Sequence, residues 1–429
     1  MEVNICQFGA VGDGVTMNTK AINAAVAEAA KNGGGRVVVP AGRFLSGSIF
    51  LEDHIELHLE PGAVLVASEN CEDYNAQDAY PQNFGSDREQ WTGRHFILAI
   101  EKTNVAITGF GKICGSGSAF FEERRRCKTL NYCWVDGFSK AKDPEAMRPG
   151  QMIVFVECSD VSMRDVTLED SPCWTALFHG CSYVSVSGIR VRNPIWHANT
   201  DGMDFDTCRF VTVTNCLIDT GDDGITIRCN PRRLLHAEPV SEHISISNCV
   251  LGSSAVGIRI GVGVGLIRNV AISNITISRA SVGIECMTAY KKRGDVSIEN
   301  VRVENVVADN VAFPIRVPQY NASTVRNVSF SHFRAQAYCS IILCAETPGM
   351  ISDITLKDFD VTLIEPRYFD HLDENAPEER GEAVLNAYGV NGLTLENVTL
   401  RVPDALKEAW PKTTCIAECE NLAKRNCSF

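Results

Sequence analysis

Apolar and polar residues alternate with a period of two along most of the chain, in short runs that end at a turn residue. One phrase recurs: a turn residue, alternating β-branched residues, Asn or Asp, and then a second short alternation. This alternation predicts β-strands, because successive side chains of a strand point to opposite faces, and Asn, Asp and Gly mark the corners. The clearest copies are residues 54–67, 103–115, 159–172, 182–194, 209–221, 242–254, 267–280, 295–309, 325–335, 351–361 and 390–400.

The spacing of the copies predicts the architecture. Successive equivalent positions are 23, 27, 33, 26 and 26 residues apart, counted over Val161, Val184, Val211, Ile244, Val270 and Val296. A repeat of about 25 residues with two or three strands is one coil of a parallel β-helix, in which inward side chains pack against the coils above and below. We therefore expect an all-β fold, a parallel β-helix that forms a single domain over residues 1–429.

Five segments depart from the repeat. An amphipathic helix is expected at its start, ending at a run of glycines and capping the open end of the core. Three polar segments with aromatic or charge clusters are expected to line the binding groove, because long loops on a rigid scaffold usually build binding surface. The last segment is expected to be a C-terminal cap or tail. In this order, the segments are residues 17–32, 68–100, 118–150, 363–388 and 403–429.

Charge and hydropathy exclude several classes of partner. The formal net charge is −13 and the pI about 5.2, and a surface this acidic repels the phosphates of a nucleic acid. No stretch of 18 or more apolar residues suggests a membrane span. The residues do not indicate an oligomeric state.

The N-terminus and the cysteines favour a cytoplasmic protein. The opening MEVNICQFGAVGDG has neither a basic n-region nor an apolar h-region. The 18 cysteines occur singly, several at similar places in successive repeats, and no Cys-x-x-Cys pair is present. We expect them to be small apolar residues stacked inside a reduced protein, with no metal or cofactor.

Two acidic phrases carry the candidate chemistry: NTDGMDFD at 199–206 and TGDDGITIR at 220–228. Asp201 and Asp222 are 21 residues apart, close to one coil, and neighbouring strands lie roughly 4.8 Å apart. Asp201 is therefore expected to face Asp222 and Asp223. Like charges so close cannot all ionise, which suits general acid–base catalysis, where a protonated acid and an ionised base share one site. Asp and Gly are also ordinary corner residues, and two such phrases one coil apart favour the catalytic interpretation.

These phrases match a known family. The chain resembles glycoside hydrolase family 28, the polygalacturonase family, over essentially its whole length. The matching segments follow in the family's order: FGAVGDGVTMNTKAINAAV, GGGRVVVPAGRFLSGSIFL, GFGKICGSG, RPGQMIVFVECSDVSM, SPCW, NTDGMDFDTC and GDDGITI. The resemblance implies a right-handed parallel β-helix and a glycosidase that inverts the anomeric carbon by direct displacement. It also implies that Asp222 is the general acid and that Asp201 and Asp223 position and deprotonate the attacking water.

Two family motifs are missing. Members usually carry Gly-His-Gly one coil beyond the Gly-Asp-Asp, but Val256 stands where that histidine belongs. The next coil usually presents Arg-Ile-Lys, whose cations hold the substrate's carboxylate, and here Glu285 and Met287 replace both. An anionic uronate needs a cation in a desolvated site, so the sequence favours a neutral sugar next to the cut.

Strand alternation suggests which side chains surround the aspartates. It places Asp204, Thr226, Arg259 and Glu285 outward in one column and Asp206, Arg228, Gly261 and Met287 in a second. Arg259 is expected to pair with Glu285, either as a charge ladder that holds the register or as a pair that hydrogen-bonds sugar hydroxyls. The other candidate substrate-binding residues are Asn199, Asp204, Arg228, His197, His179 and Tyr290, and Lys291, Lys292 and Arg293 could supply displaced cations.

Other functions remain open at this stage. One alternative is a polygalacturonase proper that acts from the chain end. It requires that cations from another part of the chain hold the substrate's carboxylate. A β-helix lyase would use a basic residue and calcium, which an aspartate cluster can bind. A non-catalytic carbohydrate-binding solenoid is the third alternative, because the family histidine is absent.

Overall fold

The computed structural model describes residues 1–124, 138–140, 147–290, 293–365 and 381–429. The chain divides into two compact units. Unit 1 consists of Met1–Arg124, Ser139–Gly221 and Pro231–Glu238, and unit 2 consists of Arg125–Phe138, Asp222–Asn230 and Pro239–Phe429. Both units are built from short parallel strands, so the predicted all-β parallel architecture is confirmed. That residues 1–429 form a single domain stays a prediction.

Unit 1 contains the one α-helix of the described residues. Its helical elements are η1 (Ile5–Phe8), α1 (Thr19–Lys31), η2 (Cys71–Asp73) and η3 (Gly117–Phe120). Its strands are β1 (Glu2–Asn4), β2 (Asp13–Met17), β3 (Gly35–Val39), β4 (Gly42–Ser46), β5 (Ile49–Phe50), β6 (Ile55–Leu59), β7 (Ala63–Ala67), β8 (Ile97–Ile100), β9 (Thr103–Gly109), β10 (Lys112–Cys114), β11 (Ile153–Val156), β12 (Ser159–Arg164), β13 (Thr167–Glu169), β14 (Ala176–His179), β15 (Ser182–Ser187), β16 (Arg190–Arg192), β17 (Met203–Asp206), β18 (Arg209–Thr214) and β19 (Leu217–Thr220).

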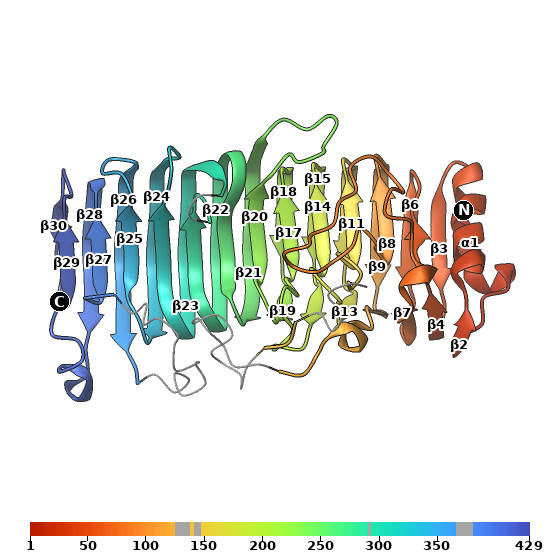
Figure 1. The fold of residues 1–429 in the computed structure, drawn as a ribbon, viewed down its shortest axis with the longest axis horizontal. Coiled ribbons are helices and arrows are strands. Elements are labelled where there is room, and N and C mark those ends of the chain that lie inside the picture. Colours follow the sequence, from red (N-terminus) through yellow and green to blue (C-terminus); the bar gives the residue numbers. More distant parts are fainter. Residues whose placement is uncertain (125–137, 141–146, 291–292, 366–380) are drawn as a thin grey trace. The chain divides into compact units, whose positions relative to one another are not determined.

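Unit 2 continues the same pattern with longer strands that turn corners. Its strands are β20 (Ile225–Cys229), β21 (Val240–Ser253), β22 (Val256–Met287), β23 (Asp295–Gln319), β24 (Val325–Ala337), β25 (Ile341–Ala345), β26 (Ile351–Leu363), β27 (Leu385–Tyr388), β28 (Val390–Arg401), β29 (Thr414–Ala417) and β30 (Ala423–Arg425), with η5 (Asp404–Leu406) between β28 and β29. Figure 1 shows β24, β26 and β28 following one another in this unit.

Three strands make one coil, and each pairs in parallel with its counterpart in the next coil. In unit 1, β11 pairs with β14, β12 with β15 and β13 with β16. Val161, Val184 and Val211 are direct partners, as the repeat predicted.

The predicted pairing of equivalent positions is confirmed for one further pair of coils and is wrong for the pair after it. Ile244 pairs with Val270, but Val270 pairs with Val301, while Val296 pairs with Gly265. The strand that starts at Asp295 has apolar residues in two phases separated by a corner, and the sequence pattern alone does not distinguish them.

Asparagines at the corners explain how the coils stay aligned. Asn269, Asn300 and Asn327 have φ values of 56°, 56° and 52°, in the left-handed region that Asn tolerates better than most residues. The Asn327 Nδ2 donates to the Asn300 Oδ1 at 2.8 Å, and the Asn300 Nδ2 donates to the Asn269 Oδ1 at 3.3 Å. Each corner amide therefore hydrogen-bonds to its counterpart in a neighbouring coil.

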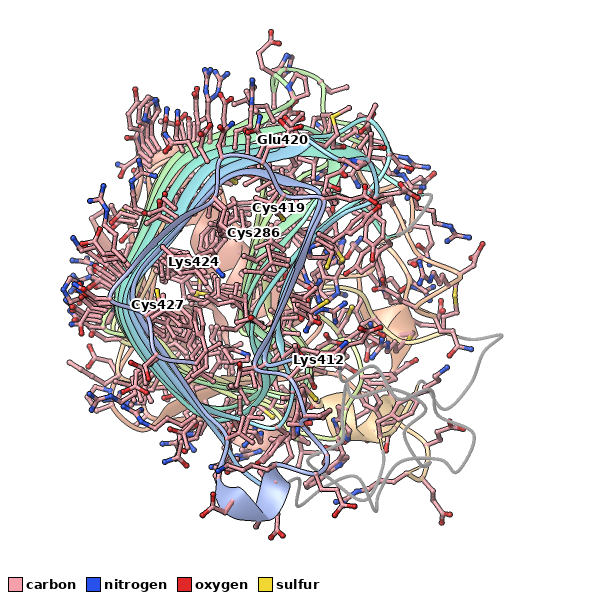
Figure 2. The ribbon with its side chains drawn as sticks, turned by 90° about the vertical axis from the view of Figure 1, so that its left-hand side faces the viewer. Cys286, Lys412, Cys419, Glu420, Lys424 and Cys427 are labelled. Atoms are coloured by element: carbon pink, nitrogen blue, oxygen red, sulfur yellow. The ribbon has the colours of Figure 1, made fainter. Side chains whose placement is uncertain are left out.

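Inward side chains stack in columns. The rings of Phe155 and Phe178 are 5.2 Å apart and those of Phe178 and Phe205 are 4.9 Å apart, all fully buried. The predicted stacked cysteines are confirmed as buried free thiols at Cys158, Cys181, Cys208, Cys216 and Cys249. Figure 2 shows the Cys286 side chain, also fully buried, inside the coils of unit 2.

The predicted capping helix is present, and it begins later than expected. Residues Asp13–Met17 form β2, so α1 spans Thr19–Lys31. It buries Ile22, Ala25, Val26 and Ala29 next to β3 (Figure 1). Gly34 then has a φ of 106°, and a Cβ there would lie 2.4 Å from the His54 Cβ, so the turn after the helix requires glycine.

The remaining predicted segments differ in part from expectation. The end of segment 68–100 is β8, and the end of segment 363–388 is β27. Within residues 403–429, β29 and β30 pair in parallel with β27 and β28 and so continue the coil, and the predicted role of this segment as a C-terminal cap or tail stays a prediction. Residues 125–137, 141–146 and 366–380 of the predicted groove loops lie outside the described residues. No helix in the described part of the chain is long and apolar enough to span a membrane.

Candidate active site

The aspartates of the two acidic phrases lie in different units, and each precedes a short strand. Asp201 precedes β17 in unit 1, and Asp222 and Asp223 precede β20 in unit 2. Their meeting in one pocket stays a prediction from the 21-residue spacing. The surroundings of each phrase are described within its own unit.

Hydrogen bonds hold Asp201 in a tight turn. Its side chain is 5% exposed, and its backbone carbonyl accepts the Thr175 N–H at 2.8 Å. The Asn193 side-chain amide donates to the Thr175 hydroxyl at 2.7 Å and to the Thr200 carbonyl at 3.1 Å. Because these groups are buried, leaving any of them unpaired would be costly, and the turn is therefore rigid.

Arg148, which the sequence analysis did not single out, organises the same turn. Its side chain is 2% exposed. One guanidinium nitrogen, Nη1, donates to the carbonyls of Pro172 and Ala198, both at 2.9 Å. The other, Nη2, donates to the Glu89 carbonyl and to the Asn199 Oδ1, both at 3.0 Å. Asn199 is thus a partner of Arg148, and its predicted role in binding substrate stays a prediction.

His197 packs as an aromatic ring in this unit. Its imidazole stacks on the Phe121 ring with centroids 3.9 Å apart and planes 8° apart, and the Trp196 ring meets it edge-on at 6.1 Å. Burial, with smaller contributions from the positive charges of Arg148 and Arg124, lowers the pKa of His197 from 6.5 to about 4. His197 is therefore a neutral imidazole at pH 7.

Two other predicted residues of unit 1 are buried strand positions. His179 on β14 is 2% exposed and pairs in register with Asp206 on β17, and its ring centroid is 5.9 Å from that of Phe84. Asp204 is 0% exposed and pairs in register with Leu177. The Asp204 side chain is therefore buried, and its predicted role in binding substrate stays a prediction.

In unit 2, Asp222 and Asp223 occupy successive positions of one turn. The Asp223 N–H donates to the Asp222 Oδ1 at 3.0 Å, and the Ser253 hydroxyl donates to the Asp222 carbonyl at 2.6 Å. Asp222 is partly exposed, whereas Asp223 is 4% exposed. The two carboxylates therefore differ in access to solvent, which suits different roles for them.

Asp223 belongs to a ladder of four alternating charges, of which Asp223, Arg259 and Glu285 are buried. The Arg259 Nε lies 2.5 Å from the Asp223 Oδ2, and the Arg259 Nη2 lies 3.1 Å from the Asp223 Oδ1. The Arg259 Nη1 donates to the Glu285 Oε2, which confirms the predicted ion pair. The Glu285 Oε1 lies 3.6 Å from the Nε of Arg316, a residue that the sequence analysis missed. Burial lowers the pKa of Arg259, but Asp223 and Glu285 raise it more, so the guanidinium stays charged.

The remaining candidates surround this ladder. Arg228 on β20 lies at a register shift between Ile227 and Cys229, so it does not continue the predicted second column directly. Tyr290 is 43% exposed, and its ring centroid lies 5.6 Å from the Arg259 Cζ. Lys291 and Lys292, the proposed displaced cations, lie outside the described residues. Val256 and Met287 have apolar side chains and are both buried, so neither adds a polar group to the site.

The match to a family model covers both acidic phrases. The model described as Glycosyl hydrolases family 28 matches residues 36–360. The chain belongs to glycosyl hydrolase family 28. It is therefore a glycosidase, as its sequence motifs suggested.

Relatives of this family 28 chain are polygalacturonases. A probable polygalacturonase of Vitis vinifera is 27% identical over 403 residues, which cover 82% of this chain and 78% of the relative. The exo-poly-alpha-D-galacturonosidase of Dickeya chrysanthemi is 27% identical over 325 residues, covering 67% and 52%. Among solved structures, the polygalacturonase of Erwinia carotovora ssp. carotovora has a TM-score of 0.65 at 22% identity, covering 83% of this chain and 94% of that one. This likeness shows the right-handed parallel β-helix fold.

A second cluster of ionisable groups lies elsewhere in unit 1 of this family 28 chain. Oxygen or nitrogen atoms of Glu101, Glu157 and His236 all lie within 4.8 Å of one another. The Gln82 Nε2 donates to both carboxylates, at 3.1 Å and 2.7 Å, and the N–H groups of residues 235–237 donate to Glu157. These hydrogen bonds give the cluster a structural role, because they attach the segment Pro231–Glu238 to Glu157.

Proposed function

We propose that this chain is an inverting glycosidase that cuts a pectin-related or other plant-type oligosaccharide next to a neutral sugar. Membership of family 28 supports the reaction class, and the surroundings of Glu285 support the choice of sugar. The observation that carries the proposal is that Glu285, at a position where the family resemblance implies a cation, is 2% exposed and paired with Arg259.

The proposed chemistry assigns one role to each aspartate. Asp222 donates its proton to the glycosidic oxygen as the bond to the anomeric carbon breaks. A water molecule attacks that carbon from the opposite face, and its proton passes to the base formed by Asp201 and Asp223. The products are a free sugar hydroxyl and a hemiacetal of inverted configuration, with no covalent intermediate.

The charges of the ladder support a neutral substrate. Two arginines and two carboxylates alternate over Asp223, Arg259, Glu285 and Arg316, so their formal charges cancel. A sugar carboxylate next to Glu285 would face another negative charge, and the arginines that contact Glu285 are already paired with it. Binding a uronate in a desolvated site requires an uncompensated cation, because the cost of removing its charge from water must be offset.

A second candidate is a polygalacturonase that acts from the chain end, and one observation favours it. The Arg316 side chain is 26% exposed, more than those of Arg259 and Glu285 at 6% and 3%, and its contact with Glu285 is long, at 3.6 Å. Arg316 is therefore the ladder cation best placed to reach a substrate carboxylate. Of the curated relatives, several are polygalacturonases, which is consistent with this candidate.

The experiment that separates the candidates is hydrolysis of a defined panel. The panel contains 4-nitrophenyl α-L-rhamnoside, 4-nitrophenyl galactosides, oligogalacturonides and rhamnogalacturonan oligosaccharides, with NMR of the first anomer released. Cleavage at a neutral sugar with inversion supports the proposal. Cleavage of oligogalacturonides alone supports the polygalacturonase. Retention of configuration, or unsaturated products that absorb in the ultraviolet, would reject the proposed mechanism.

The Asp222→Asn variant tests the catalytic assignment. We expect kcat to fall by at least about a thousandfold with substrate binding nearly unchanged, because the amide cannot supply the proton. The control is Asp219→Asn, an exposed aspartate three residues earlier, which should keep wild-type activity. Turnover in Asp222→Asn at the wild-type rate would reject Asp222 as the acid.

We also propose that the protein works in a reducing, cytoplasmic environment. Every cysteine that the structure describes is a free thiol, including buried ones in successive coils. Fractionation of the source cells with an antibody against this chain tests this localisation.

A further inference from the structure

Asp223 accepts three hydrogen bonds in a buried position. The Val256 backbone N–H reaches its Oδ1 at 3.0 Å, and the Arg259 Nη2 reaches the same oxygen at 3.1 Å. The Arg259 Nε reaches Oδ2 at 2.5 Å. Val256 is the residue at the place of the family histidine, so here that position contributes only a backbone donor.

The arginine contact fixes the carboxylate in orientation as well as in charge. Two nitrogens on one edge of a planar guanidinium meet the two oxygens of a planar carboxylate, an arrangement with a single preferred geometry. A lysine at this position would bring one point charge and leave the carboxylate able to rotate. Asp223 is 4% exposed and Arg259 is 5% exposed, so little water competes for either group.

The rest of the ladder holds the arginine itself. The Arg259 Nη1 donates to Glu285, and Glu285 is bound on its other oxygen by Arg316. Register supports the same order, because β20 pairs Thr226 with Arg259 and β22 pairs Glu285 with Arg316. Tyr290 covers the guanidinium with its ring. Each of the four nitrogen–oxygen contacts of the ladder therefore joins neighbouring coils of unit 2.

We propose that Arg259 is a positioning residue for hydrolysis, which holds the Asp223 carboxylate in the orientation that accepts the proton of the attacking water. The inference rests on the proposed function, in which Asp223 is part of the base. In this chain Arg259 is buried and paired with Glu285, which Arg316 contacts in turn. Arg259 therefore acts through Asp223 and makes no contact with the sugar.

The test uses the full chain and the panel substrate that the wild type cleaves fastest. Arg259→Gln combined with Glu285→Gln removes the cation without leaving Glu285 unpaired, and Arg259→Lys keeps the charge but loses the two-nitrogen contact. The matched control is Arg268→Gln with Glu242→Gln. This pair also joins β22 to a neighbouring strand, with the Arg268 Nε 2.8 Å from the Glu242 Oε2.

Four results are expected together. The Arg259/Glu285 double variant loses about a hundredfold in kcat with KM within about threefold, the loss typical of a misplaced catalytic group. The pH profile of its kcat/KM also differs from that of the wild type, because the proton acceptor has lost its two-nitrogen contact with Arg259. Arg259→Lys falls between this variant and the wild type, and the control double variant keeps wild-type kcat.

A readout independent of turnover is the carboxyl ¹³C resonance of Asp223, identified by its loss in Asp223→Asn. Its chemical shift at a fixed pH should differ between the wild type and the Arg259/Glu285 variant, because the variant lacks both Arg259 contacts to this carboxylate. If both the resonance and the pH profile are unchanged in that variant while Asp222→Asn is inactive, the positioning role is rejected and the glycosidase proposal stands. If Asp222→Asn is fully active, the proposed catalytic assignment fails instead.

Discussion

At the scale of single residues, burial determines what each ionisable group of the candidate site can do. Arg259 stays charged because two carboxylates surround it, whereas His197 stays neutral because aromatic rings and two arginines surround it. His197 is thus a neutral ring stacked on Phe121, and its predicted role in binding substrate stays a prediction.

His197 predicts a specific dependence of stability on pH. Its folded pKa of about 4 lies below the 6.5 of an ordinary histidine, so the unfolded chain binds a proton in this interval and the folded chain does not. The free energy of unfolding should therefore fall as pH drops from 6.5 to about 4. In His197→Phe, which keeps the ring stack, this fall between about pH 7 and pH 4.5 should be smaller by roughly 2 kcal/mol.

Urea unfolding at several pH values measures this difference. Identical pH dependence in His197→Phe and the wild type would contradict the lowered pKa.

At the scale of the coil, the same ring geometry occurs inside and outside the strands. Phe178 and Phe205 stack inside with centroids 4.9 Å apart and planes 10° apart. Tyr183 and Phe210 stack outside with centroids 4.9 Å apart and planes 8° apart, and they are 58% and 44% exposed. Burial is the main difference between the two pairs, so they separate the contribution of burial from that of stacking.

Truncating one ring of each pair should give unequal losses. Phe178→Ala leaves a cavity between two neighbouring phenylalanines and should lower the free energy of unfolding by about 3–5 kcal/mol. Tyr183→Ala removes an exposed ring and should cost less than about 1 kcal/mol. Chemical denaturation of both variants measures the losses, and equal losses would show that stacking, and not burial, stabilises the coil.

At the scale of the whole molecule, each of the two units is a series of coils, and each coil packs mainly on its neighbours. The family match runs from residue 36 to 360 and thus covers most of both units. In such a solenoid, stability is close to a sum of local terms, so a defect in one coil does not weaken distant coils equally.

Amide hydrogen exchange tests this locality. Phe178→Ala should speed exchange in β11, β14 and β17 of unit 1 and leave β24, β26 and β28 of unit 2 near their wild-type rates. The reciprocal variant is Phe359→Ala, which removes one ring of the buried Phe333–Phe359 stack in unit 2. A uniform rise in exchange in either variant would show that the chain opens as one cooperative body.

Several features followed from the sequence alone because they depend on local periodicity. The alternation predicted the coil, the partners Val161, Val184 and Val211, and the buried cysteines. It also predicted the Arg259–Glu285 pair, since residues one coil apart on the same face must be neighbours. The acidic phrases identified the candidate catalytic residues, and their order along the chain identified the family.

Only the tertiary structure decided the contacts that do not follow the repeat. Arg148 lies in the segment 118–150, which departs from the repeat, so the alternation did not predict its bonds to groups 24 to 59 positions away along the chain. Arg316 was found only from the register of β22 with β23. Val296 was assigned the wrong partner because its strand alternates in two phases. Periodicity determines which face a side chain takes, whereas register shifts, corners and loops determine which neighbour it meets, and those depend on the packing of the whole coil.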